Sequence, residues 1–415
     1  MRRTVEQDGT CVQAIPYKRS FEARIEGVEM KIGRWARWLL VAAPVLAGCL
    51  AGCGNFWQAP SSSTTTPSGA SSGVFYVLNQ GTKQIAGYSI VTGTLTAVTG
   101  SPYTLSAAPY SIAIAPSGAF LYVGTAQGIY LYTIGSGGAL TLANNSSVIS
   151  SDLAATMQVD STDSWLVEAG PNQAELAAIA ISPSTGLETS KTEQTVPIPA
   201  ATVNQLVISP DNKNVFMALG SAGTEVVPFT GTPFGTTLTN IPVKGTAGAA
   251  VSVAVDPSNR LFYVGEVAVS SGTSNTGGLR AFNYSSLSST LTEVASTPYP
   301  SGGLAPYSIL PTANGDYVYV ANRTVSGSST GNISSFSFTS TGTAYSLTSL
   351  GSTASAGTTP VALVEDRLDN YLLVVDSGGS PDLEAYSMSA GTLTSALTSS
   401  TGTDPVQASA IAAAP

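Results

Sequence analysis

Short runs of apolar and aromatic residues, separated by Gly, Pro, Asn and Ser, recur along the chain from residue 73 to the C-terminus. Runs such as 120–123 and 317–320 are rich in Tyr, Val and Phe, which favour β-strands. Alternating runs such as 128–134 and 383–388 predict strands with one buried face. Long amphipathic patterns of helical period are absent after residue 60, so we predict an all-β fold.

These runs belong to an internal repeat. Residues 108–123, APYSIAIAPSGAFLYV, match residues 305–320, APYSILPTANGDYVYV, without a gap. Weaker copies follow the same frame. Counted from Pro116, the equivalent positions lie at successive spacings of 45, 49, 47, 56 and 54 residues, and they are Ser161, Pro210, Pro257, Ala313 and Arg367. This period fits the four-stranded blade of a β-propeller. Between the first two strands of a unit, turns of the Pro-Ser-Gly or Pro-Asp-Asn kind are expected, with Gly or Asn at the tight corner.

The two ends of the repeat region are complementary fragments of one unit. Residues 73–96 lack a first strand, and residues 404–415 supply only a first strand. Six internal units plus this shared one predict a seven-bladed β-propeller over residues 73–415. Its last blade is closed by pairing of the N- and C-terminal strands, which removes an exposed sheet edge. A pair of β-sandwiches or a β-helix fits the period and the split ends poorly.

The first 72 residues predict targeting and a tether. Residues 30–53 have the basic, apolar and small-residue order of a secretory signal. They also resemble the bacterial lipoprotein processing box, Leu-Ala-Gly-Cys, which occurs twice and ends at Cys49 and at Cys53. We favour lipidation of Cys53, because the small Gly54 follows it; the alternatives are lipidation of Cys49, or an ordinary signal peptide in which the cysteines are incidental.

Two further segments flank this signal. Residues 1–29 precede a complete signal and predict an extension from a mis-assigned start, whereas the Ser/Thr/Pro-rich residues 54–72 predict a disordered tether. By resemblance to known lipoprotein sorting, the absence of Asp after the cysteine implies a lipid anchor in the bacterial outer membrane, with the protein facing the periplasm or the cell surface.

Charge and composition exclude several function classes. Residues 53–415 contain eight Lys or Arg and twenty Asp or Glu, so neither nucleic acid nor an anionic lipid surface is an expected partner. The 415-residue chain has no His, and its three cysteines, Cys11, Cys49 and Cys53, all precede the repeats. Ser-His-Asp catalysis, Cys-His catalysis and His-based zinc sites are therefore excluded, and we expect no cofactor and no metal site.

The repeats resemble a known family. VFYVLNQGTKQIAGYSIVTGTLT at residues 74–96 and the copies of Ala-Pro-Tyr-Ser-Ile are similar to the YVTN-type and lactonase-type propellers, which include one type of 6-phosphogluconolactonase and a muconate-cyclising enzyme. The resemblance covers nearly all of residues 73–415, but its motifs belong to blade geometry rather than to a reaction. Enzymatic members have a site of Arg, Glu and His near the channel mouth, and the missing His prevents any transfer of that site.

Candidate site residues come from one position of the repeat, just after the second strand. The residues there are Asn79, Thr125, Gly170, Leu219, Glu266, Asn322 and Asp376, and Arg323 follows Asn322. A lactonase would use Glu266 or Asp376 as the general base and Arg323 as the oxyanion partner. The structural alternative is that these polar groups cap turns and that Arg323 pairs with an acid.

A binding face is predicted from the same positions. It combines Asn79, Thr125 and Asn322 with Tyr110 and Tyr307, which lie at matching entries to first strands; shared packing is the alternative interpretation of the two tyrosines. We therefore expect a monomeric, non-catalytic binding or scaffold protein of the cell envelope, which meets a protein or glycan at its channel mouth. The alternative is a lactone hydrolase, although an acidic mouth would repel a phosphorylated lactone.

Overall fold

The computed structural model describes residues 71–91, 93–190, 193–230, 234–236, 238–269, 276–288, 290–325, 328–342, 344–379, 381–399 and 407–415. All of them belong to one compact unit, residues 55–415. The predicted extension at 1–29, the signal at 30–53 with Cys49 and Cys53, and residues 54–70 of the tether lie outside the described residues.

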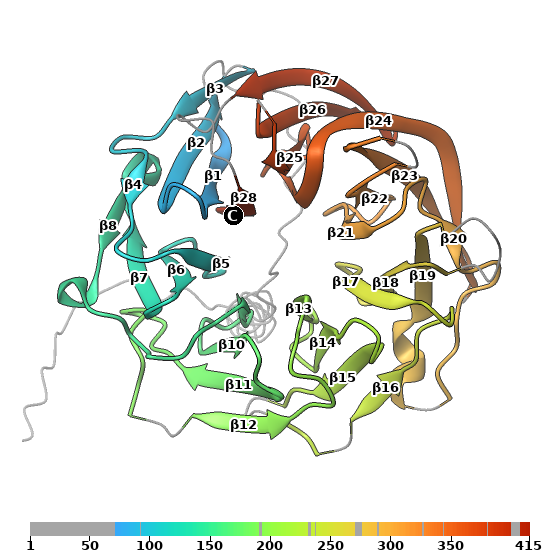
Figure 1. Ribbon diagram of the computed structural model, residues 1–415, viewed down its shortest axis with the longest axis horizontal. Helices are drawn as coiled ribbons and strands as arrows, with labels where there is room; N and C mark the ends of the chain where they lie inside the picture. Colours follow the sequence, from blue (N-terminus) through green and yellow to red (C-terminus); the bar gives the residue numbers. More distant parts are fainter. Residues whose placement is uncertain are drawn as a thin grey trace, which may run out of the picture. The chain divides into compact units, whose positions relative to one another are not determined.

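The described residues form antiparallel sheets that follow one another around a ring, with the innermost strands near its centre (Figure 1). The first sheet consists of β28 (Ala408–Ala413), β1 (Ser71–Asn79), β2 (Gln84–Val91) and β3 (Thr94–Ala97), and β4 (Tyr103–Thr104) also pairs with β2. The second consists of β5 (Pro109–Ile114), β6 (Phe120–Thr125), β7 (Gly128–Ile134) and β8 (Leu140–Leu142). The third consists of β9 (Thr156–Val159), β10 (Trp165–Ala169), β11 (Glu175–Ala180) and β12 (Gln194–Pro197).

Two more sheets have four strands each, and the last sheet is larger. The fourth consists of β13 (Gln205–Ile208), β14 (Asn214–Ala218), β15 (Thr224–Pro228) and β16 (Thr239–Ile241), and the fifth of β17 (Ala249–Val255), β18 (Leu261–Val267), β19 (Gly278–Asn283) and β20 (Tyr299–Pro300). The sixth runs through β21 (Pro306–Pro311), β22 (Tyr317–Asn322), β23 (Thr330–Thr341), β24 (Ala344–Glu365), β25 (Tyr371–Gly378), β26 (Leu383–Ser389) and β27 (Thr392–Ser399). Short 3₁₀ segments lie at η1 (Ser136–Gly138), η2 (Asn144–Ser146) and η3 (Tyr284–Ser288).

The sequence predicted seven separate blades, and the structure corrects this count. The described residues form six hydrogen-bonded sheets, five of them with the four or five strands of a single blade. The sixth is one continuous sheet of seven strands, because β24 stays extended over 22 residues. It pairs with β23 as far as Thr358 and with β25 from Thr358 onward, so the two repeat units that it spans merge. The predicted all-β propeller fold is present, but the division into seven separate blades is wrong.

The turn between the first two strands has the same geometry in all six internal repeats. The residue two positions after each equivalent of Pro116 has a positive φ between 53° and 71°. These residues are Gly118, Asp163, Asn212, Asn259, Gly315 and Asp369. Only Gly, Asn and Asp occur here because they tolerate the left-handed backbone conformation better than other residues. The Gly or Asn corner predicted from the sequence is confirmed at four of the six turns, and Asp takes its place at the other two.

Apolar clusters between neighbouring sheets form the core. One cluster joins Phe120, Tyr122 and Leu131 of the second sheet to Leu166 and Ile179 of the third. Every residue of β6 and β10 is buried, as expected for second strands that are covered on both faces. The predicted pairing of the chain ends is present, because β28 runs antiparallel to β1 from the Phe75–Ala413 pair to the Asn79–Ala408 pair. Within the described part of the chain, every helical segment is too short to cross a membrane.

Candidate functional site

Five polar residues occupy one repeated position at the end of a second strand, and the side chains of all five are fully buried. They are Asn79, Thr125, Glu266, Asn322 and Asp376. Each faces the first strand of its repeat unit at a register shift, opposite Ala408, Pro109, Ala250, Pro306 and Pro360 respectively. The other two predicted positions, Gly170 and Leu219, are buried as well. The repeat therefore brings these residues to equivalent places, but within the sheets rather than on an exposed rim.

Glu266 is held in a buried ion network. Its Oε1 accepts a hydrogen bond of 2.6 Å from Nη1 of Arg280, and its Oε2 accepts one of 2.9 Å from the backbone N–H of Lys244. Arg280 also donates to Oε1 of Glu293 at 2.9 Å and to the carbonyl of Pro242 at 2.8 Å. Burial alone would lower the pKa of Arg280, but the hydrogen bonds to Glu293 and Glu266 outweigh it and raise that pKa. The Glu266 carboxylate is thus neutralised by a cation that stays charged.

Asp376 is buried without such a partner. Neither of its carboxylate oxygens has a hydrogen-bond partner of normal geometry among the described residues. Burial raises its pKa to about 8, the nearby acids Glu384 and Asp382 push in the same direction, and the backbone N–H of Gly357 opposes them to a lesser extent. An acid with this pKa can exchange a proton near neutral pH, which is the property expected of a general base.

Arg323 lies over an aromatic ring. Its guanidinium carbon is 4.4 Å from the centroid of Tyr307, a cation–π arrangement, and both side chains are partly exposed. Neighbouring Asn322 points inward instead, where its Nδ2 donates to the carbonyl of Ser301 at 2.6 Å and to Oδ1 of Asn332 at 2.9 Å. Arg323 and Tyr307 are therefore neighbours, as residues of a shared rim would be.

Thr125 and Tyr110, the other predicted binding residues in this part of the ring, lie close to turns and strand ends. Oγ1 of Thr125 donates to the carbonyl of Gly128 at 2.9 Å and accepts from the N–H of Gln127 at 3.1 Å, so it caps a turn. Tyr110 is partly exposed on β5, and Asn79 ends β1.

The three residues predicted for catalysis are not joined by contacts. Among the described residues, no hydrogen bond or ion pair links Glu266, Asp376 and Arg323 to one another. Glu266 belongs to the fifth sheet, whereas Asp376 and Arg323 belong to the sixth, at β25 and just after β22. The role of each as base or oxyanion partner stays a prediction.

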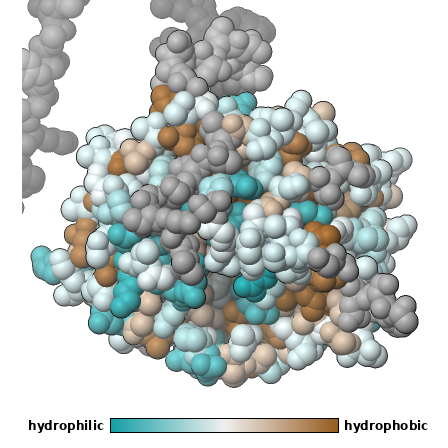
Figure 2. Space-filling view, turned by 45° about the horizontal axis from the view of Figure 1, so that its top comes forward, coloured by the Kyte–Doolittle hydropathy of each residue, from teal (hydrophilic) through white to brown (hydrophobic). Residues whose placement is uncertain are grey.

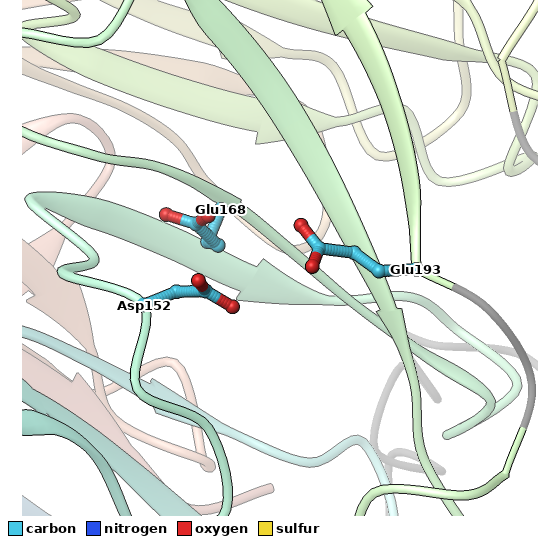
Figure 3. A group of neighbouring side chains, drawn as sticks. All are labelled: Asp152, Glu168 and Glu193. Atoms are coloured by element: carbon cyan, nitrogen blue, oxygen red, sulfur yellow. The ribbon is translucent and has the colours of Figure 1, made fainter.

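The sequence reasoning missed an acidic cluster between the second and third sheets. Asp152, Glu168 and Glu193 place one carboxylate oxygen each so that all lie within 4.8 Å of one another (Figure 3). A cavity of about 360 Å³ lies beside Glu188, whose pKa is raised by burial and then by Asp152; its other lining residues are Asn144, Ile149, Leu187, Thr189 and Ser190. A signal existed in the sequence: Glu168 is a lone acid inside the apolar run Trp165–Ala169.

A second acidic group lies at the turn after β24, where Glu365, Asp366 and Asp369 are close together. Asp366 caps this turn through its Oδ1, which accepts from the N–H of Asn370 at 2.7 Å and from that of Tyr371 at 2.5 Å. The carboxylate of Glu365 accepts from the N–H of Ala313 at 2.8 Å in the neighbouring turn. These bonds make the group part of the contact between adjacent turns.

The exposed surface is mixed in character. Figure 2 shows strongly hydrophilic residues grouped near the middle of the face it presents, while the most apolar residues lie in separate small patches. Such scattered apolar residues are ordinary for a protein surface.

Solved structures with a similar fold include proteins linked to sugar lactones. A protein from Bacteroides uniformis, provisionally described as a 6-phosphogluconolactonase, matches with a TM-score of 0.62 and 14% identity, covering 82% of this chain and 98% of that one. The periplasmic gluconolactonase of Pseudomonas aeruginosa matches with a TM-score of 0.62 and 14% identity over 83% and 99% of the two chains. A functionally unknown protein from Desulfotomaculum acetoxidans has a TM-score of 0.59 and 13% identity over 82% and 98%.

At these identities the similarity concerns the fold: the chain is a β-propeller protein whose structural neighbours include lactonase-like propellers. No protein-family model matches the sequence, and no curated protein sequence matches it.

Proposed function

We propose that this protein is a lipid-anchored β-propeller of the bacterial cell envelope that binds a protein or glycan and catalyses no reaction. The observation that supports this most strongly is the state of Glu266. Its carboxylate is buried, pairs with Arg280 at 2.6 Å and accepts a second hydrogen bond from Lys244. Both oxygens of this carboxylate already accept hydrogen bonds and its side chain is fully buried, so neither water nor a substrate can reach it as a general base.

The proposed binding face centres on Arg323 and Tyr307. Their stacked side chains are partly exposed, and a flat cation–aromatic pair offers both a hydrogen-bond donor and a ring face to a sugar or peptide. The predominance of acids over bases in residues 53–415 favours an uncharged or basic ligand over an acidic one.

A second candidate function is lactone hydrolysis, with Asp376 as the base. It is favoured by the pKa of about 8 that burial gives to this carboxyl, and by the fold shared with the Pseudomonas aeruginosa periplasmic gluconolactonase. Against it stands the burial of Asp376, which is 0% exposed and, among the described residues, forms no hydrogen bond or ion pair with Arg323. Hydrolysis of lactones by the purified full-length protein separates the two candidates: the binding proposal expects rates equal to those in buffer.

The anchor has its own test. The proposal places the protein on the outer membrane through a lipid on Cys53, or on Cys49, so wild-type protein should sediment with outer membranes. Changing both cysteines to Ser should move it to the soluble fraction, while a Cys11→Ser variant should stay membrane-bound. Membrane association of the double variant, or a soluble wild type, would reject the anchor.

A further inference from the structure

The acidic cluster between the second and third sheets is assembled from three different segments. Glu168 lies in β10, Glu193 immediately precedes β12, and Asp152 lies in the connection from the second sheet to the third. Glu168 and Ala177 are register partners in adjacent strands, and Ala177 is in turn the partner of Thr195. The small Ala177 side chain leaves room for the two glutamates on this face, which packs towards the second sheet.

Glu168 is the feature of this cluster that needs explanation. Its side chain is only 2% exposed, and its Oε2 has no hydrogen-bond partner among the described residues. Figure 3 shows its carboxylate facing those of Asp152 and Glu193. Burying a carboxylate beside two others without a compensating cation is costly.

Positive charge that could balance these acids is scarce in this part of the chain. The sequence between Lys83 and Lys191 contains no Lys or Arg, and Lys191 itself lies outside the described residues. No ion pair in the described part of the chain involves Asp152, Glu168 or Glu193. Burial, followed by the charges of Asp152, Glu193 and Glu175, raises the pKa of Glu168 to about 8.

We propose that Asp152, Glu168 and Glu193 bind one divalent cation, and that this cation is Ca²⁺. Oxygen ligands bound at about 2.4 Å can lie up to about 4.8 Å apart across one ion, which matches the spread of these carboxylates. Three carboxylates from irregular segments suit Ca²⁺, because Mg²⁺ demands near-ideal octahedral geometry and usually takes only one or two. Asp152 and Glu193 are partly exposed, so water can complete the coordination.

The ion would link the connection between two sheets to two strands of the third sheet. Because the acids would otherwise repel one another, the folded protein should gain stability in Ca²⁺. This inference does not depend on whether the propeller is catalytic.

The test is calcium titration of the full-length protein, purified in detergent and stripped with EDTA. Isothermal titration calorimetry should give one site, with a Kd on the order of 10⁻⁴–10⁻³ M as in extracellular calcium modules. Calcium at about ten times that Kd should raise Tm, and the same concentration of Mg²⁺ should have a much smaller effect. In Glu168→Gln, binding should weaken more than tenfold and the Tm shift should vanish.

Two controls keep the result interpretable. Glu168→Gln should fold in EDTA with a Tm equal to or above that of wild type, since the amide removes the buried charge. Glu225→Gln, which changes another buried glutamate on β15, should bind Ca²⁺ like wild type. Absence of calcium binding by wild type, or wild-type affinity in Glu168→Gln, would overturn the proposed site, and an equal response to Mg²⁺ would overturn its assignment to calcium.

Discussion

Nη1 of Arg280 lies 2.6 Å from Oε1 of Glu266, with only 6% and 1% of the two side chains exposed. The pair spans adjacent strands, β19 and β18, and Glu293 extends it at 2.9 Å. A carboxylate that the repeat pattern assigned to an open mouth is thus part of an internal ion network. The ion pair with Arg280 favours a structural role for Glu266 over a catalytic one.

Removing the cation of this network should strongly destabilise the fold. In Arg280→Met, the buried Glu266 carboxylate keeps only the N–H of Lys244 as a partner. Breaking a buried ion pair from one side costs about 3–5 kcal/mol, and we expect a loss of that size in the free energy of unfolding, measured with urea.

Two further variants test whether the loss of stability comes from the buried charge. Glu266→Gln combined with Arg280→Met leaves no buried charge and should recover part of the loss. Arg323→Met, at an arginine that stacks on Tyr307, should change stability by no more than about 1 kcal/mol. Similar losses in the free energy of unfolding for Arg280→Met and Arg323→Met would show that the buried network contributes no more to stability than the stacking of Arg323 on Tyr307.

Asp376 should make stability depend on pH. Its pKa is raised from 3.8 to about 8 in the folded protein, so the native state binds more protons than the unfolded state between these values. Stability contributed by the protonated form is fully present below pH 4 and is lost as pH rises towards 8. Glu168 and Glu365, whose pKa values burial also raises to about 8, act in the same direction.

Asp376→Asn should remove the contribution of this group. We expect the variant to be more stable than wild type at pH 8, by roughly 1–3 kcal/mol, and to match it more closely at pH 5. Asp316→Asn, at an exposed acid, serves as the control and should leave the pH dependence unchanged. Urea unfolding at both pH values measures the effect, and an unchanged slope in Asp376→Asn would contradict the raised pKa.

The C-terminal strand should be essential for the ring. Deleting residues 407–415 removes β28 and leaves β1 as an exposed edge. The loss of a paired inner strand should lower Tm by roughly 10 °C or more and promote aggregation, which calorimetry and size-exclusion chromatography would detect. Deleting Pro415 alone should have little effect, because it follows the last paired residue. A truncated protein as stable as wild type would refute the role of this strand.

Local turn chemistry and the complementary chain ends made much of the fold predictable. Pro-Ser-Gly and Pro-Asp-Asn turns specify left-handed corners such as Gly118 and Asn212, and both adopt them. The merging of β23, β24 and β25 was not predictable, because the small residues GSTASAGTTP at 351–360 have weak strand preference. Backbone pairing keeps this segment extended, with β23 as far as Thr358 and with β25 from Thr358 onward.

The candidate site was predictable in position but not in environment. The repeat placed Glu266 at the end of a second strand, whereas nothing in the sequence paired it with Arg280, the one cation in the apolar run Gly278–Asn283. Only strand pairing brings the two together. Similarly, Asp152 and Glu193 lie 16 and 25 residues from Glu168 in the sequence. The three acids come together only because the connection between the second and third sheets packs against β10 and the start of β12.

The most direct measurement of the proposed function is hydrolysis of phosphorylated and unphosphorylated sugar lactones by the purified full-length protein. The account predicts that wild type, Asp376→Asn and Arg323→Ala all give the rate of buffer alone. Protein-dependent hydrolysis that falls about 100-fold in Asp376→Asn or Arg323→Ala, with both variants folded by circular dichroism, would contradict it and establish an enzyme.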